Sequence, residues 1–161
     1  MLNKSYIAIG SNLGNREQNI RGAIDTLRSN PLCTVTNESR LYDTEPLLKE
    51  GSGEQGWYLN GAIEIETTLA ASDLLSLLQE IEIELGRPLP RKSGEARIID
   101  LDILFFEDLV IKTADLTIPH PELHKRMFVL QPLYDIAPTL MHPTLRMSVG
   151  DLKTKLDKIL K

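Results

Sequence analysis

Apolar and polar residues alternate along this chain with two different periods, one typical of strands and one typical of helices. Short apolar or alternating stretches predict strands at residues 6–10, 34–42, 59–67 and 98–106. Apolar residues spaced three and four positions apart predict helices at residues 16–29 and 72–85. The order strand–helix–strand–strand–helix–strand predicts an α+β fold, a ferredoxin-like α/β sandwich with an antiparallel sheet.

The ends of these two helices are marked by residues that cap or stop a helix. Asn15 is placed to cap the first helix, and Pro31 is placed to stop it. Ser72 is the predicted N-cap of the second helix, and Gly86 stands where a helix commonly ends in glycine.

The last part of the chain predicts additional helices. A short one is expected around residues 127–134, and an amphipathic one from about Ser148. The apolar face of the latter consists of Val149, Leu152, Leu156 and Ile159. These helices form a C-terminal helical elaboration of the sandwich. Because no repeat or linker is visible, we expect one domain over residues 1–161.

Composition narrows the function without identifying it. The chain is 42% hydrophobic and 25% charged, and its net charge of −5 argues against general nucleic-acid binding. No apolar run approaches the roughly 18 residues that span a bilayer, and the N-terminus lacks the pattern of a signal peptide. Cys33 is the single cysteine, so we expect no disulfide and a buried strand position. A cytoplasmic protein without membrane partners is predicted.

Two aspartates interrupt the most strand-like segment. Asp100 and Asp102 stand two residues apart, so in a strand their carboxylates project from one face, roughly 6–7 Å apart. Their neighbours are apolar, and burying two carboxylates there is costly unless a cation compensates. Mg²⁺ suits such a pair because it binds oxygen ligands and completes its shell with water and substrate phosphates. The alternative is an exposed strand end where both aspartates are merely solvated.

A basic segment directly precedes this pair. Arg87, Arg91, Lys92 and Arg97 fall within eleven residues, among prolines and a glycine that predict an irregular loop. Arginine can bind phosphate through two parallel hydrogen bonds, so arginines beside metal-binding aspartates indicate a polyphosphate substrate. Solvated surface charge is the alternative, particularly for Arg91 and Lys92.

Three further polar residues are candidates for ligand contacts. His120 lies between two prolines, which could position its ring to donate to phosphate, although a capping or packed histidine fits the pattern equally. Asn60 is unusual in a strand, and its amide could read the edge of a heterocycle or make a plain cross-strand hydrogen bond. Glu82 lies beside the apolar face of the second helix and, taken alone, is predicted to be a surface charge.

Together, these segments resemble the 6-hydroxymethyl-7,8-dihydropterin pyrophosphokinases of folate biosynthesis, over roughly residues 5–140. The matching stretches are Tyr6–Gly14, Tyr42–Leu47, Tyr58–Asn60, Ile81–Arg87, Arg97–Leu104, Pro119–His120 and Arg126–Leu133. The resemblance implies a ferredoxin-like fold. It also implies a transferase that moves the β,γ-diphosphate of ATP onto the hydroxymethyl oxygen of 6-hydroxymethyl-7,8-dihydropterin and releases AMP.

The same resemblance implies roles for individual residues. Two Mg²⁺ ions bound by Asp100 and Asp102 would bridge the triphosphate, and these aspartates with Arg97, His120 and Arg126 would form the catalytic group. Contacts to ATP are implied for Glu82, Arg87, Arg91, Lys92, Arg97, Thr117, His120 and Arg126. The pterin pocket would consist of Thr44, Leu47, Tyr58, Asn60 and Phe128. The glycine-rich segment 48–57 and the basic segment 87–97 would close over both substrates and exclude water.

Three positions depart from the pattern of the family. Gly94 stands where many members have tryptophan, Leu89 where a basic residue is usual, and Asp115 where arginine is often found. The altered basic segment leaves open a catalytically silent ferredoxin-like module that binds nucleotide or a partner protein. A different nucleotidyl or phosphoryl transferase on the same fold is the other alternative. We expect a monomer or weak dimer whose partners are the two small-molecule substrates.

Overall fold

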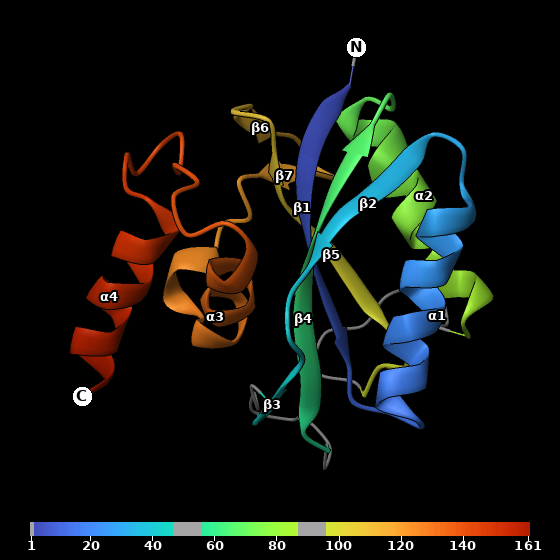
Figure 1. Ribbon diagram of the computed structural model, residues 1–161, viewed down its shortest axis with the longest axis horizontal. Coiled ribbons are helices and arrows are strands. Elements are labelled where there is room, and N and C mark those ends of the chain that lie inside the picture. The colour runs from blue at the N-terminus through green and yellow to red at the C-terminus, as the bar shows by residue number, and fades with distance from the viewer. Residues whose placement is uncertain (1, 47–55, 87–95) are drawn as a thin grey trace.

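The computed structural model describes residues 2–46, 56–86 and 96–161, which form a mixed α/β structure (Figure 1). The first elements along the chain are β1 (Asn3–Ser11), α1 (Arg16–Ser29), β2 (Cys33–Glu38), β3 (Tyr42–Thr44), β4 (Tyr58–Thr67), α2 (Ala71–Glu84) and β5 (Asp100–Phe106). The remaining elements are β6 (Ile111–Lys112), β7 (Thr117–Ile118), the 3-10 helix η1 (Leu123–Lys125), α3 (Met127–Ile136) and α4 (Val149–Leu160). The predicted elements occur in the predicted order, with one expected strand divided into β2 and β3, and β6, β7 and η1 are additional elements.

The long strands form one antiparallel sheet in the order β2–β4–β1–β5, and β3 also pairs with β4. The central strands β1 and β4 pair from Asn3 opposite Thr67 to Ser11 opposite Leu59. Helices α1 and α2 cover one face of the sheet, and α3 and α4 lie on the other (Figure 1). The predicted ferredoxin-like sandwich with a C-terminal helical elaboration is therefore confirmed.

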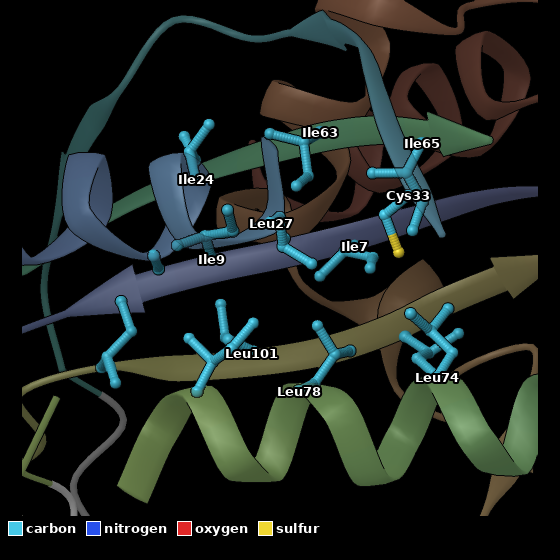
Figure 2. Close-up of a cluster of buried hydrophobic side chains, with 14 of the residues drawn as sticks. Ile7, Ile9, Ile24, Leu27, Cys33, Ile63, Ile65, Leu74, Leu78 and Leu101 are labelled. Carbon is cyan, nitrogen blue, oxygen red and sulfur yellow. The ribbon is translucent and has the colours of Figure 1, made fainter. Parts of the chain in front are cut away.

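The first hydrophobic core fills the space between the sheet and helices α1 and α2 (Figure 2). Alternate strand residues such as Ile7 and Ile63 point into it and meet the apolar stripes of the helices, for example Leu78. Burying one side chain of this kind contributes about 1.5–3 kcal/mol, so this layer stabilises the sandwich strongly. Cys33 is buried on β2, as predicted.

The second core lies on the opposite face, between the sheet, α3 and α4. β5 contributes two consecutive residues to it, Leu104 and Phe105, because a bulge shifts the pairing of β5 with β1 at this point. Before the bulge the strand alternates regularly, and Leu101 points into the first core. Asp100 and Asp102 therefore face the side of the sheet that carries α3.

The strand predicted over residues 34–42 is interrupted where the chain passes close to β4. A Cβ on Gly61 would lie 2.7 Å from Leu41 Cδ2, so the missing side chain leaves the space in which Leu41 packs over β4. Ser39 fixes the crossing, since its Oγ accepts a hydrogen bond from the backbone N–H of Ala62 at 2.8 Å. The interruption separates β2 from β3 and lets β3 extend along β4 next to the candidate site.

The helices begin where the capping residues predict, with one exception. Asn15 Oδ1 caps α1 at 3.1 Å from the N–H of Gln18, and Ser148 Oγ caps α4. Ser72 does not cap α2, because the helix starts one residue earlier, at Ala71, and its N-cap position is Ala70, which has no side chain able to cap. Across the three described stretches of chain, no helix has both the length and the apolar character to cross a bilayer.

The apolar stripe of α4 is shorter than predicted. Leu152 and Leu156 pack in the second core, but Ile159 is 68% exposed. It lies on the same side of the helix as these two residues, so its exposure arises because the last turn extends beyond the core.

A buried histidine closes the second core. His142 is 6% exposed, and its ring lies edge-on to Phe105 with 5.6 Å between centroids. Its Nδ1 accepts hydrogen bonds from the backbone N–H groups of Thr144 and Leu145, at 3.2 and 3.0 Å. Burial lowers the pKa of His142 below its ordinary value, and nearby His124 lowers it further. The folded chain thus favours the neutral ring.

We expect the free energy of unfolding to decrease as pH falls below about 6.5, because His142 binds a proton more readily in the unfolded chain. One proton can contribute at most about 1.4 kcal/mol per pH unit. His142→Asn keeps a side-chain acceptor, so it should flatten this dependence without removing it, since the pKa of His120 is lowered as well. Urea unfolding between about pH 5 and pH 8 measures the slope, and an unchanged slope in the variant would contradict this account.

Candidate active site

The cleft that gathers most of the described candidate residues lies on the α3 face of the sheet. It is lined by Ala8, Ile9, Gly10, Asn60, Gly61, Asp100, Asp102, Leu104, His120, Arg126, Phe128 and Val129. The members predicted from the sequence come from β4, β5, the segment after β7 and the start of α3. Residues far apart in the chain are thus brought to one place.

The floor of this cleft is open because the central strand has small residues there. Gly10 on β1 lies opposite Asn60 on β4 and opposite Asp100 on β5. Two residues before Gly10 on β1, Ala8 lies opposite Asp102. Neighbouring strands are about 4.8 Å apart, so Asn60 and Asp100 flank a gap about 10 Å wide in which Gly10 has no side chain.

The two aspartates are half-buried on this face, and one of them pairs with an arginine. Arg97 Nη1 donates to Asp100 Oδ2 at 2.9 Å, and the two side chains are 22% and 17% exposed. Burial opposes the charge of the guanidinium, but the Asp100 carboxylate raises the pKa of Arg97 above its ordinary value. A cation therefore already offsets part of the negative charge beside Asp102.

His120 is fixed to β5 by its backbone and presents its ring to the cleft. Its N–H donates to the carbonyl of Leu104 at 3.0 Å, and its Nδ1 accepts from the N–H of Glu122 at 3.2 Å. Burial lowers the pKa of His120, and Arg126 lowers it further, against the opposing effect of Asp100. The neutral ring then carries its proton on Nε2, which is suited to donate to a phosphate oxygen.

The start of α3 forms the wall opposite the sheet. Arg126 immediately precedes the helix, and its Cζ lies 5.7 Å from the ring centroid of Phe128. This cation–π contact holds the guanidinium at the amino end of α3, where the helix dipole adds partial positive charge. Phe128 thereby offers a flat apolar surface next to a cationic group.

Asn60 is oriented by β3. Its Nδ2 donates to Thr44 Oγ1 at 2.6 Å, which is the cross-strand hydrogen bond considered for this residue. Its Oδ1 lies against Gly10, where an added Cβ would come within 2.7 Å of it. Tyr58 Cδ1 is 3.4 Å from the same point. Thr44 and Tyr58 are therefore neighbours of Asn60 at the edge of the cleft.

Asn12 was not identified from the sequence, and it holds the backbone of two segments next to the cleft by hydrogen bonds. It is 6% exposed at the end of β1. Its Oδ1 accepts from the N–H of Arg97 at 2.6 Å, and its own N–H donates to the Arg97 carbonyl at 3.0 Å. Its Nδ2 donates to the carbonyl of Gly56 at 3.3 Å. An asparagine directly after a buried strand is a signal for such backbone contacts.

Glu82 is not the surface charge that its position alone suggested. It is 2% exposed on the sheet-facing side of α2, and its Oε2 accepts from the N–H of Leu101 at 2.8 Å. β5 is an edge strand, so this contact satisfies a backbone donor that has no neighbouring strand. Thr117 is half-buried on β7. The assignment of both residues to nucleotide binding stays a prediction.

Other predicted residues lie outside the described part of the chain. They are Leu47, Arg87, Leu89, Arg91, Lys92 and Gly94, with most of the two segments expected to close over the substrates. Asp115 is described: it is exposed just before β7 and lines an open groove between α2 and the β6–β7 hairpin.

The donor set of the cleft fits magnesium bound together with a phosphate substrate. Asp100 and Asp102 supply two carboxylates on one face, next to a cleft. Among the residues with described positions, no three histidine, cysteine, aspartate or glutamate side chains cluster as a metal site. Mg²⁺ commonly takes one or two protein carboxylates and completes its shell with water and phosphate oxygens.

Residues 6–138 match the family described as 7,8-dihydro-6-hydroxymethylpterin-pyrophosphokinase (HPPK). The chain belongs to this family. HPPK enzymes are pyrophosphokinases of folate biosynthesis that use ATP as co-substrate, so the predicted family and enzyme class are confirmed.

The relatives that this chain matches differ in length. The chain is 45% identical to 2-amino-4-hydroxy-6-hydroxymethyldihydropteridine pyrophosphokinase of Bacillus subtilis over 136 residues, which cover 84% of this chain and 79% of that protein. It is 40% identical to the folic acid synthesis protein FOL1 of Dictyostelium discoideum, over 94% of this chain and 22% of that one. The chain thus spans about a fifth of FOL1 and most of the bacterial relative.

The fold also matches solved HPPK structures. The HPPK-DHPS protein of Plasmodium falciparum superposes with a TM-score of 0.79 at 18% identity, covering all of this chain and 43% of that one. At this identity the likeness concerns the fold, and it agrees with the ferredoxin-like architecture and its helical elaboration.

Gly10→Ala should lower the free energy of unfolding by about 1–3 kcal/mol, because the added Cβ overpacks the floor of the cleft against Asn60 Oδ1. Gly22→Ala is the matched control. Its Cβ would lie 3.7 Å from Leu85 Cδ2, and the change removes a glycine from α1, so it should be neutral or stabilising. Urea unfolding measures both variants. A Gly10→Ala protein as stable as its parent would show that the glycine is not required.

Proposed function

We propose that this cleft transfers the β,γ-diphosphate of ATP to the hydroxymethyl oxygen of 6-hydroxymethyl-7,8-dihydropterin and releases AMP. The observation that carries the proposal is the row Asn60–Gly10–Asp100 across three neighbouring strands of an HPPK-family chain. On one side of Gly10 lies the Asn60 amide, which can form hydrogen bonds with the edge of a heterocycle. On the other side stand carboxylates able to hold metal-bound phosphates. The acceptor hydroxyl and the β-phosphorus would meet above the glycine.

The pterin would lie between β4 and α3. Phe128 supplies a flat ring on which the heterocycle can stack, and Asn60 supplies an amide whose orientation Thr44 fixes. Tyr58 lies beside Asn60 and completes this edge. Leu47, which lies outside the described residues, is proposed to contact the pterin as well.

The triphosphate would lie along β5. Arg126 at the start of α3 and Arg97, paired with Asp100, would supply positive charge, and His120 would supply a neutral N–H donor. These groups are held before the substrate arrives, so they need little rearrangement to stabilise charge in the transition state. Glu82 and Thr117 are proposed to contact the nucleoside end.

Two Mg²⁺ ions are proposed to be held by Asp100 and Asp102, where they would offset the charge of the triphosphate and favour attack at the β-phosphorus. The Arg97–Asp100 ion pair is compatible with this role. A carboxylate has about four lone-pair sites, so Asp100 can accept from Arg97 and bind a metal ion at the same time.

The residues contribute mainly by positioning. A bond forms between the hydroxymethyl oxygen and the β-phosphorus, the bond from that phosphorus to the oxygen shared with the α-phosphate breaks, and the hydroxyl proton is finally released to solvent. AMP leaves with the bridging oxygen. Holding the acceptor hydroxyl in line with this bond, in a site shielded from water, supplies most of what such a transfer requires.

The remaining expectations concern the whole protein. We propose that residues 1–161 act as one domain, because α4 packs against α3 in the same core that supports the cleft. A cytoplasmic location and a monomer or weak dimer are proposed together with the folate-pathway role. No nucleic-acid or membrane partner is part of this proposal.

An assay for AMP separates the proposal from its alternatives. With ATP, Mg²⁺ and 6-hydroxymethyl-7,8-dihydropterin, we expect AMP to form in proportion to the pterin consumed. A silent binding module would form no AMP at saturating substrates. A different transferase would consume ATP without requiring pterin. Either result would overturn the proposed reaction.

Asp102→Ala should reduce turnover by at least about a thousandfold and weaken binding of Mg–ATP, because it removes one of the two metal ligands. The fold should survive, since the side chain is half-buried at the edge of a cleft. Asp108→Ala is the matched control: this exposed aspartate lies in the turn after β5 and should leave turnover unchanged. Steady-state kinetics and calorimetric binding of Mg–ATP provide the measurements. Normal turnover in the Asp102 variant would exclude the metal assignment.

A further inference from the structure

A hydrogen bond outside the cleft joins the two elements that border its pterin side. Tyr42 Oη on β3 donates to Asp135 Oδ2 on α3 at 2.6 Å, across 93 residues of sequence. Gln131 Nε2 reaches the other oxygen of the same carboxylate at 3.5 Å. The hydrogen bond from Tyr42 to the Asp135 carboxylate raises the pKa of Tyr42 above its ordinary value. The carboxylate is thus held both by its own helix and by the sheet.

On α3, the carboxylate shares a face with the proposed stacking ring. Phe128, Gln131 and Asp135 are spaced at i, i+3 and i+7, which places them along one side of the helix. The ring and the carboxylate therefore point in similar directions, about two turns apart. A roll or shift of α3 that separates Asp135 from Tyr42 also moves Phe128 relative to the sheet.

On the sheet, Tyr42 belongs to the short strand that orients Asn60. β3 pairs with β4 through Tyr42–Asn60, Asp43–Leu59 and Thr44–Tyr58, and through no further residue pairs in the described part of the chain. Tyr42 and Thr44 are two residues apart, so their side chains lie on the same side of the strand. Thr44 accepts the hydrogen bond that orients the Asn60 amide. The position of β3 therefore directly affects the orientation of the Asn60 amide.

We propose that Tyr42 and Asp135 form a positioning pair, which sets the distance between the Asn60 amide and the ring of Phe128 and thereby tunes affinity for the pterin. This inference rests on the proposed function, in which both Asn60 and Phe128 contact the pterin. The aspartates of the metal site stand on β5, which is separated from β3 by β4 and β1 in the sheet. Arg126 at the start of α3 belongs to the nucleotide side, so the selectivity of the pair for the pterin rests on β3, which orients Asn60 and carries no proposed nucleotide contact.

A purely structural role makes a different prediction. Asp135 is exposed and Tyr42 is half-buried, so their hydrogen bond contributes little to global stability. If it only helped to hold the fold, its removal would change unfolding slightly and would affect both substrates alike. A positioning role predicts a selective loss of pterin binding in a protein that melts normally.

The experiment is calorimetric titration with 6-hydroxymethyl-7,8-dihydropterin in the presence of Mg²⁺ and α,β-methylene-ATP, which cannot react. Tyr42→Phe and Asp135→Ala should each raise the Kd of the pterin about three- to tenfold, the effect of one lost hydrogen bond. The double variant should lose no more than about what one change loses, because both remove the same contact. The Kd of the nucleotide analogue should stay within about twofold in all of them.

Two further variants test the assignment. Asp135→Asn keeps an acceptor for Tyr42, so it should restore pterin affinity to within about twofold of the parent. Tyr134→Phe is the matched control, because it removes the neighbouring hydroxyl on α3 and keeps the ring over which Lys153 lies. It should leave both affinities unchanged.

The outcomes distinguish this pair from the reaction itself. Additive losses in the double variant, equal losses for pterin and nucleotide, or unchanged pterin affinity in Tyr42→Phe would each overturn the positioning role. Unchanged affinity in the variants, with normal AMP formation by the parent, would overturn the pair alone. A parent that binds no pterin and forms no AMP would overturn the proposed function and the pair with it.

Discussion

The contacts of the candidate site depend on the small residues that β1 carries on one face. Ala8 and Gly10 stand in the middle of the sheet, with strands on both sides. Larger side chains there would fill the space between β4 and β5, as the second core is filled farther along the same face by Tyr6 and its neighbours. Because these two positions are small, Asn60 and the aspartates can face a common space. The small side chains at these two positions of β1 therefore determine where the cleft forms.

Charge is the second constraint, because two carboxylates are half-buried beside each other. The structure meets it with Arg97, which lies three residues before Asp100. Side chains three residues apart in a regular strand point to opposite faces, so the two can pair only because Arg97 lies before the strand begins. Asn12 supplies the missing support by exchanging two hydrogen bonds with the backbone of Arg97. The guanidinium is therefore fixed through the end of β1, the strand that also forms the floor. The shape of the cleft and the position of its positive charge thus both depend on β1.

The sequence predicted well those features that depend on local periodicity, such as the element order, the shared face of Asp100 and Asp102, and the caps Asn15 and Ser148. It predicted poorly what depends on close approach between distant segments. The break between β2 and β3 lies where Leu41 packs closely over Gly61 of β4, and no local pattern indicates this contact. The helix pattern alone predicts Glu82 to be a surface charge, because nothing in that pattern shows that an edge strand will offer it a backbone donor.

Helix α3 shows why the elaboration is part of the site and not an addition to it. A ferredoxin-like sandwich covers one face of its sheet with two helices and leaves the other open. Here α3 and α4 cover only part of that second face. Leu130 and Leu133 of α3 are buried in the second core, while Phe128 lines the part that stays open. Since one rigid helix carries both sets, the packing that stabilises the second core also places the cleft's wall. Substitutions that loosen this core are therefore expected to affect ligand binding before they unfold the chain.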